Sequence, residues 1–224
     1  MKHIIEVKNL TKVFKDGTDI TRVLKGIDFE VKEGEFVAIM GRSGAGKSTF
    51  LYQMSLLDNP TTGTIIINGH NVDALDNDER TSFRLRELGY VFQDYSLLPE
   101  LTACENIMVP LLMQGVSEKV ARDRAMEALV SVSLGHRPDN LPSELSGGEQ
   151  QRVSIARAIT HNPKIIFADE PTANLDSESS NLVMGIFQKL NKEKKLTIVM
   201  VTHEEEYGKK ADRIVKLADG LIIK

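Results

Sequence analysis

Cysteine is almost absent from this chain: Cys104 stands alone among 224 residues, so no disulfide can form within the chain. A fold without disulfides fits a reducing compartment such as the cytosol, and it must be held together by a packed core. Hydrophobic residues make up 41% of the sequence, an ordinary share for a globular protein. The length then predicts a single domain, 1–224, with at most a small subdomain.

Long apolar runs are also missing. No stretch approaches the roughly 18 consecutive apolar residues that cross a bilayer as a helix. Residues 1–9 lack the apolar core and the cleavage-site pattern of a signal peptide. We therefore expect a cytoplasmic chain that would need a partner protein for any work at a membrane.

Positive charge is not in excess, because 28 Lys and Arg residues stand against 32 Asp and Glu residues, for a formal net charge of -4. Such a balance gives no general attraction to nucleic acid or to anionic lipid. We expect no nucleic-acid partner, and any basic residues that bind phosphate must be gathered locally.

Glycine, by contrast, is concentrated in residues 41–48, GRSGAGKS, which lie between an apolar run at 36–40 and a segment free of Gly and Pro. This is the G-x-x-x-x-G-K-[ST] pattern in its strand–turn–helix context, and it predicts a helix over about 46–57. The glycines let backbone N–H groups face an anion, and the start of the helix adds its positive dipole. Lys47 should reach the β- and γ-phosphates of a nucleoside triphosphate, and the Ser48 hydroxyl should bind Mg²⁺. The residues predicted to bind the nucleotide here are Gly41, Arg42, Ser43, Gly44, Ala45, Gly46, Lys47, Ser48 and Thr49.

Two carboxylates, Asp169 and Glu170, end an apolar run that begins at residue 164 and is typical of a buried parallel strand. Sheets of α/β proteins place their chemistry at the carboxyl ends of such strands. Asp169 is predicted to bind Mg²⁺ together with Ser48, and Glu170 to activate an attacking water as general base.

Two further polar residues follow predicted strands. Gln93 comes after a short apolar strand at 89–92 and could orient the attacking water or add an oxygen ligand to the metal. His203 follows the apolar run 196–201 and could donate to the γ-phosphate, although a histidine after a strand is more often structural.

A second anion-binding position is predicted at Ser146, Gly147, Gly148 and Glu149. Ser146 and Glu149 have the spacing of a capping box, so a structural role alone would explain those two residues. The adjacent glycines exceed what a cap needs and expose bare N–H groups at the start of a helix.

The remaining pattern predicts an α/β fold in two parts. Alternating residues at 4–10 and 23–31 predict an N-terminal antiparallel β part, and the buried runs predict a parallel sheet, so that 1–93 and 163–224 form the core. Residues from about 94 to 162 show helical patterns with no strand between them, which predicts an inserted α-helical subdomain.

Two details of the helices are also predicted. Acidic residues at 76–79 indicate a helix start, and Arg80, Arg84 and Arg86 on that helix are expected on a solvated face. Pro110 is expected to end or kink the helix that begins near residue 102.

Taken in order, these motifs resemble those of the ATP-binding-cassette (ABC) ATPases, over essentially the whole chain. Residues 145–150, LSGGEQ, are the signature of that family. The resemblance identifies a Walker A loop at 41–48, a Walker B strand at 165–169, a Q-loop at Gln93, a D-loop at 173–176 with Asp176, and a switch histidine at His203. Phe14 stands where the family places an adenine-stacking aromatic, more often Tyr.

The resemblance implies the ABC ATPase fold, a P-loop NTPase core with an antiparallel β subdomain and a helical subdomain. It implies ATP hydrolysis with Mg²⁺ in a homodimer, in which two copies face head to tail around two ATP molecules. Ser146, Gly147, Gly148 and Glu149 of one copy would then contact the γ-phosphate held by the other. The segment around 94–115 would contact an integral membrane permease-type subunit, so that the chain is peripheral on the inner face of the cell membrane.

Residues 56–63, 97–102 and 105–106, with Pro110, resemble the lipoprotein-releasing, macrolide-exporting and cell-division subgroup. We therefore expect an ATPase subunit that drives export, lipoprotein extraction or mechanotransmission. The alternative is a soluble, non-transport ABC ATPase acting on nucleic acid or ribosomes, but such relatives carry a long coiled-coil insertion or two cassettes, and this sequence shows neither. A nucleotide sensor without turnover is disfavoured because Glu170 and His203 are both present.

Overall fold

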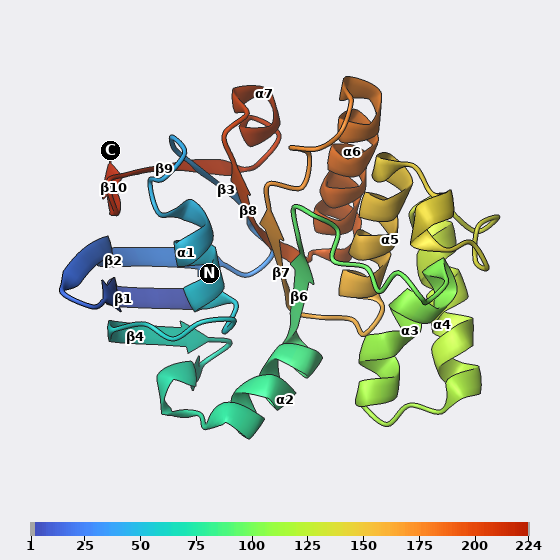
Figure 1. Ribbon diagram of the computed structural model, residues 1–224, viewed down its shortest axis with the longest axis horizontal. Helices are drawn as coiled ribbons and strands as arrows, with labels where there is room; N and C mark the ends of the chain where they lie inside the picture. Colours follow the sequence, from blue (N-terminus) through green and yellow to red (C-terminus); the bar gives the residue numbers. More distant parts are fainter. Residues whose placement is uncertain (1–2, 224) are drawn as a thin grey trace.

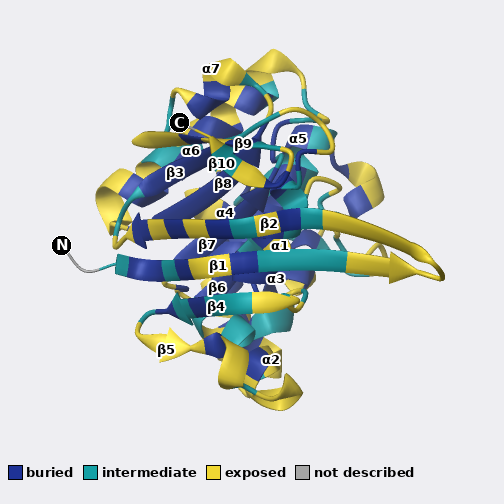
Figure 2. Ribbon diagram, turned by 90° about the vertical axis from the view of Figure 1, so that its left-hand side faces the viewer, coloured by how far each residue is buried: buried dark blue, intermediate teal, exposed yellow. Residues whose placement is uncertain are grey.

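An antiparallel sheet forms one side of the molecule in the computed structural model, which describes residues 3–223 (Figure 1). β1 (His3–Asp16) and β2 (Asp19–Lys32) make one long hairpin, and β4 (Thr62–Ile67) and β5 (His70–Asn71) continue the sheet on the β1 side. Figure 2 shows this hairpin buried over the half nearer the chain's N-terminus and exposed at its tip. The predicted antiparallel part is confirmed. β1 and β2 extend beyond the alternating residues 4–10 and 23–31, because their pairing continues to Asp16 and Asp19 at the turn.

The second sheet has the strand order β10-β9-β3-β8-β7-β6. Its parallel strands are β3 (Phe36–Met40), β6 (Leu88–Val91), β7 (Ile165–Asp169), β8 (Thr197–Thr202) and β9 (Arg213–Ala218), and β10 (Leu221–Ile223) pairs antiparallel with β9 at one edge. In the register of the sheet, Met40 lies opposite Thr202 and Asp169 opposite Val201. The carboxyl ends of β3, β7 and β8 therefore meet at the same edge.

Helices cover the second sheet on one face, and α1 with the first sheet covers the other (Figure 1). Phe36 and Ala38 of β3 point to the helical face, whereas Val37 and Ile39 point to α1, because successive side chains on a strand alternate. Both faces are buried, which explains the continuous apolar runs of β3, β7 and β8. The helices are α1 (Lys47–Met54), α2 (Asn77–Glu87), α3 (Ala103–Met113), α4 (Glu118–Ser131), α5 (Gly147–Ile159), α6 (Ser177–Lys194) and α7 (Glu205–Gly208), with short 3-10 turns at Val72–Ala74 and Pro142–Glu144.

The apolar core of the helical segment is continuous with the helical face of the second sheet. No separate core therefore marks a boundary among the described residues, and the division of the chain at residues 94 and 162 stays a prediction.

Two helices differ in length from the sequence prediction. α1 ends at Met54 rather than near residue 57, because the chain turns at Leu56, which has a positive φ of 61° and a buried side chain. Pro110 does not end its helix: α3 continues to Met113, with Ile107 and Leu111 buried on either side of the proline. Packing therefore outweighs the backbone hydrogen bond that proline cannot donate.

The expectation of a solvated arginine face on α2 is wrong for two of its three arginines. Arg80 is only 6% exposed and donates to the Asp58 carbonyl at 3.2 Å, and Arg84 donates to the Leu56 carbonyl at 2.9 Å. These carbonyls lie in the connection between α1 and β4, so the arginines fix α2 against that connection. Arg86 is exposed, as expected.

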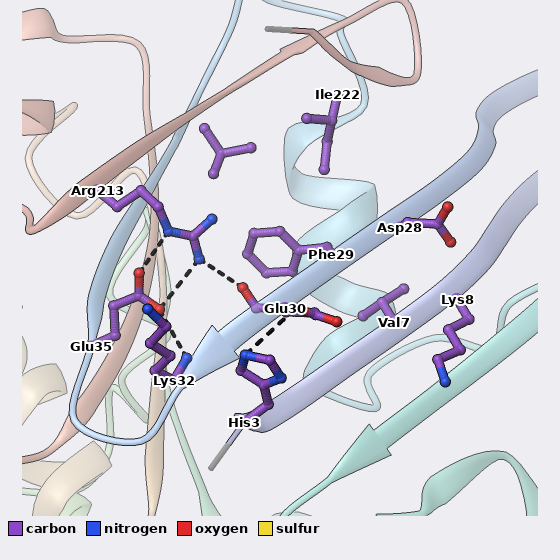
Figure 3. Close-up of a pocket in the computed structure, with 11 residues that line it drawn as sticks. His3, Val7, Lys8, Asp28, Phe29, Glu30, Lys32, Glu35, Arg213 and Ile222 are labelled. Carbon is purple, nitrogen blue, oxygen red and sulfur yellow. Dashed lines mark hydrogen bonds and ion pairs between the residues drawn. The ribbon is translucent and has the colours of Figure 1, made fainter. Parts of the chain in front are cut away.

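Arg213 joins the two sheets where β2 passes the start of β9 (Figure 3). Its Nε lies 2.6 Å from Glu35 Oε1, and one of its terminal nitrogens donates to the Glu30 carbonyl at 2.7 Å. Glu35 also accepts a hydrogen bond from the Lys32 N–H at 2.8 Å. β2 is an edge strand, so some of its backbone groups have no neighbouring strand to bond with. The ion pair provides hydrogen-bond partners for two of them, the Glu30 carbonyl and the Lys32 N–H. A hollow of about 720 Å³ lies beside it, and its lining is both charged and apolar.

Candidate active site

The loop at residues 41–48 connects β3 with α1. Gly44 and Gly46 have positive φ angles of 77° and 97°, which residues with side chains rarely adopt. Gly41 is required for a different reason, because a Cβ atom there would collide with the Leu217 carbonyl oxygen. α1 begins at Lys47, so the N–H groups of its first turn are available to an anion bound at the loop. The Lys47 side chain is 6% exposed.

Ser48 and Asp169 lie side by side, as the sequence predicts for a shared metal site. The Ser48 hydroxyl donates to Asp169 Oδ1 at 2.9 Å. Burial raises the pKa of Asp169, and the neighbouring charge of Glu170 adds to this, although the Ser48 hydroxyl acts in the opposite direction. Tyr90 on β6 donates to Asp169 Oδ2 at 3.5 Å. Sequence reasoning missed Tyr90, because a tyrosine in an apolar strand is indistinguishable from a core residue.

Glu170 lies between a cation and the histidine at the end of β8. Its Oε1 is 3.5 Å from Lys47 Nζ, and its Oε2 is 2.6 Å from His203 Nδ1. The residue has a positive φ of 42°, and its N–H donates to the Val201 carbonyl. This left-handed backbone is uncommon outside glycine, and such strain is concentrated at functional sites. The Glu170 side chain is 16% exposed, so it is within reach of a ligand but largely withdrawn from water.

A cleft of about 1130 Å³ opens beside these groups. Its lining includes residues 40–45, Lys47, Glu170 and His203, all near the expected phosphate position. A further wall of the cleft comes from the β9–β10 hairpin, with Lys216 and Asp219 among its residues. The sequence prediction missed this wall, because nothing in residues 213–223 distinguishes it from an ordinary hairpin.

Phe14 lies on the β1–β2 hairpin with 47% of its side chain exposed, so it is not part of the core. Val23 of the same hairpin packs beside Gly46, and Phe14 pairs with Thr21, two positions further along β2. At about 3.3 Å per residue, the ring is displaced by roughly 7 Å from the loop along the strand. Lys12 Nζ lies 4.9 Å from the ring centroid. The exposed ring is therefore accessible to a ligand at this end of the hairpin.

The other predicted residues lie outside the cleft lining. Gln93 is exposed, and its carbonyl accepts a hydrogen bond from Asn174 at 3.1 Å. Asp176 caps α6 by accepting from the Ser179 N–H. Ser146 and Glu149 form the expected capping box at the start of α5. Among the described residues, the structure does not bring 146–149 to the cleft formed by the same chain.

A group of three or more His, Cys, Asp or Glu side chains that could hold a metal is not found within residues 3–223. The adjacent Ser48 and Asp169 oxygens nevertheless suit Mg²⁺, which commonly takes one or two protein oxygens and completes its shell with phosphates and water. Across the same residues, none of the helices is both long and apolar enough to cross a bilayer.

Comparisons with known proteins agree with this geometry. A family model described as ABC transporter matches residues 24–173. The lipoprotein-releasing system ATP-binding protein LolD of Aquifex aeolicus is 47% identical over 223 residues, with 100% of this chain and 97% of that protein covered. The macrolide export ATP-binding/permease protein MacB of Syntrophobacter fumaroxidans is 46% identical over 221 residues, and the chain spans only 31% of its length.

A solved structure gives the same result for the fold. The dimeric structure of the ATP-binding cassette MJ0796, in a post-hydrolysis state with ADP and Pi, matches with a TM-score of 0.92 and 43% sequence identity. The match covers 98% of this chain and 97% of that one. The predicted fold class is thereby confirmed.

Proposed function

The chain belongs to the ABC transporter family and is an ATP-binding, ATP-hydrolysing cassette, and from this premise we propose how its residues work and what they drive. The main support for this proposal is the position of Glu170. Its carboxylate contacts Lys47 on one side and His203 on the other, at the edge of the cleft.

In this proposal Lys47 and the N–H groups of residues 41–49 hold the β- and γ-phosphates of ATP. Glu170 accepts a proton from the attacking water, because its carboxylate is the base beside the expected γ-phosphate position. His203 holds that carboxylate in place and donates to the γ-phosphate as negative charge develops there. Phe14 stacks on the adenine, and its aromatic face supplies this contact without the hydroxyl of a tyrosine.

Mg²⁺ bound with ATP would neutralise charge on the β- and γ-phosphates. The chain's own oxygens for it are the Ser48 hydroxyl and the Asp169 carboxylate, which already lie 2.9 Å apart. Gln93 would add its side-chain oxygen, or orient the attacking water, once its exposed loop moves toward the phosphate. Asp169 would thus position the metal, while Glu170 would accept the proton from water.

A second copy of the chain would complete each site. Ser146, Gly147, Gly148 and Glu149 lie at the start of α5, away from the cleft of their own chain, and an anion-binding helix end suits a phosphate supplied by another chain. The D-loop residue Asp176 would lie near the same interface. Support comes from the dimeric state named for the MJ0796 cassette.

We propose that α3 and the loop before it contact an integral membrane subunit, so that the chain acts at the inner face of the cell membrane. Leu98, Leu112 and Met113 are 46%, 44% and 64% exposed. Met113 also borders a hollow of about 290 Å³ between α2, α3 and α5, whose lining includes Leu85 and Val109 together with charged side chains. An apolar segment of a membrane subunit would cover these side chains. The names of LolD and MacB favour export or lipoprotein release over action on nucleic acid or ribosomes.

This function is tested by capturing the Glu170→Gln variant from native membranes with ATP and identifying its partners by mass spectrometry. A stoichiometric integral membrane protein is expected. The matched control adds Met113→Glu, which should remove that protein while keeping the ATP-dependent dimer. Recovery of ribosomes or DNA-bound proteins instead would favour the non-transport alternative.

A further inference from the structure

Gln151 occupies an unusual position in α5, the helix that begins at the signature residues. Its side chain is fully buried, with 0% exposure. Its Nε2 donates to the Pro171 carbonyl at 2.9 Å and lies 3.4 Å from the Phe92 carbonyl. Pro171 directly follows Glu170, and Phe92 directly precedes Gln93. The Gln151 side chain therefore contacts the backbone next to both residues that are predicted to act on the attacking water, Glu170 and Gln93.

The orientation of this amide is fixed by its neighbours. Both contacted groups are carbonyl oxygens, so the amide must turn its NH₂ group toward them. Its Oε1 atom is then buried without a hydrogen-bond partner among residues 3–223. An unsatisfied buried carbonyl is unfavourable, but an apolar side chain of the same size would leave the Pro171 carbonyl without this donor. The hydrogen bond to Pro171 is thus kept although the side chain's own oxygen has no partner among residues 3–223.

The same helix holds the loop after β6 at a second point. Arg157 donates to the Ser96 carbonyl at 2.6 Å and to the Tyr95 carbonyl at 2.9 Å. Tyr95 and Ser96 have positive φ angles of 64° and 47°, and two successive left-handed residues that are not glycine are strained. The first part of the loop is therefore tied to α5 at two points, by Gln151 and by Arg157.

The tyrosine of this loop also reaches the start of α5. A Cβ atom added at Gly147 would lie 2.8 Å from the Tyr95 hydroxyl, so the ring covers the first signature glycine. Three segments are thus in contact with one another in space: the start of α5, the loop carrying Gln93 and the turn after Glu170.

We propose that Gln151 is a positioning residue, which transmits phosphate binding at the start of α5 to Glu170. This inference rests on the proposed function, because the phosphate would come from ATP held by the second copy. A small shift of α5 on closure moves the Gln151 amide, and the Pro171 carbonyl follows it. The carboxylate of Glu170 is then brought to its working position only when the signature is occupied. Gln151 itself touches neither ATP nor water.

The test compares Gln151→Met with Ser154→Ala. Methionine has the length of glutamine but lacks the donor, and Ser154 is a second fully buried polar residue of α5 whose Oγ has no partner among the described residues. We expect Gln151→Met to lower kcat for ATP by at least about tenfold, since a small misplacement of a catalytic group is costly. KM should change little, the melting temperature should fall because the Pro171 carbonyl loses its donor, and Ser154→Ala should behave as the wild type.

A second measurement separates positioning from stability. Gln151→Met combined with Glu170→Gln should still form the ATP-dependent dimer, because binding and closure do not need the Gln151 donor. A wild-type kcat for Gln151→Met, or parallel losses of kcat, ATP affinity and melting temperature, would overturn the inference. Gln151→Asn keeps the amide but is too short to reach both carbonyls, so it should show the same loss of kcat. This variant replaces Gln151→Met in the test if the methionine variant does not fold. Wild-type hydrolysis by Glu170→Gln alone would instead contradict the proposed function.

Discussion

Glu170 Oε2 lies 2.6 Å from His203 Nδ1, and this contact joins the carboxyl ends of β7 and β8. His203 is 55% exposed, whereas Glu170 is 16% exposed, so the histidine covers the carboxylate on the solvent side. The strained backbone of Glu170 and the contact with Lys47 hold the carboxylate from the other side. Contacts from both sides therefore hold the Glu170 carboxylate at the edge of the cleft.

Removing this contact should slow hydrolysis more than it weakens ATP binding. His203→Ala is expected to lower kcat by about 10²-fold, the scale of a lost acid–base or charge-stabilising group, because Glu170 is left free to rotate. Equilibrium ATP binding should change by less than about threefold, since Lys47 and the glycine loop are intact. Steady-state kinetics and fluorescent-nucleotide titration measure the two effects. His136→Ala, at an exposed histidine far from the cleft lining, is the control and should leave both unchanged.

Phe14 should contribute to affinity rather than to turnover. Phe14→Ala is expected to weaken ATP binding by about 1–3 kcal/mol, the usual loss for base–aromatic stacking, while kcat at saturating ATP is kept. Phe14→Tyr should bind like the wild type. Ile20→Ala changes another exposed apolar residue of the same hairpin, 63% exposed, and should have no effect. An equal loss of affinity in both alanine variants would show that the hairpin tip, not the aromatic ring, matters.

The Glu35–Arg213 pair should make stability depend on pH in the acid range. Burial alone would raise the pKa of Glu35, but hydrogen bonds from Arg213 and the Lys32 N–H outweigh it and lower the pKa below the usual 4.5. A lowered carboxylate pKa stabilises the folded state above about pH 4.5, and this stabilisation is lost as the pH falls through the folded-state pKa.

We expect Glu35→Gln to destabilise the protein by about 1 kcal/mol at pH 7, because the ion pair is partly exposed. Thermal melts of variant and wild type should converge as the pH is lowered below 4.5. A difference in melting temperature that stays constant from pH 7 to pH 3 would mean that the charge of Glu35 has no part in it.

Much of this arrangement could be predicted from local sequence. The loop at 41–48 and the capping boxes that begin α2 and α5 depend on residues close together in the chain, so their patterns are sufficient. The continuous apolar runs identified the buried parallel strands, because both faces of the second sheet are covered. Phe14 was identified as a candidate only through the resemblance to ABC ATPases. The residue pattern of the hairpin alone did not show whether its side chain is exposed or buried.

Long-range partners were not predictable in the same way. Arg80 is buried where its guanidinium donates to the Asp58 carbonyl in the α1–β4 connection, and the residue spacing within α2 does not predict that contact. Pro110 stays inside a helix because neighbouring side chains pack on both sides of it. Tyr90 reaches Asp169 across adjacent strands, and the β9–β10 wall reaches the cleft only through the order of the sheet.

We propose that Glu170 activates water in a site completed by a second copy of the chain. The most direct measurement is ATP hydrolysis by wild type and Glu170→Gln, together with light scattering coupled to gel filtration in ATP and Mg²⁺. We expect a hydrolysis rate reduced at least about 10²-fold in the variant, with ATP binding retained and a dimer that persists only with ATP. Hydrolysis by Glu170→Gln at the wild-type rate, or a variant that stays monomeric when saturated with ATP, would contradict it.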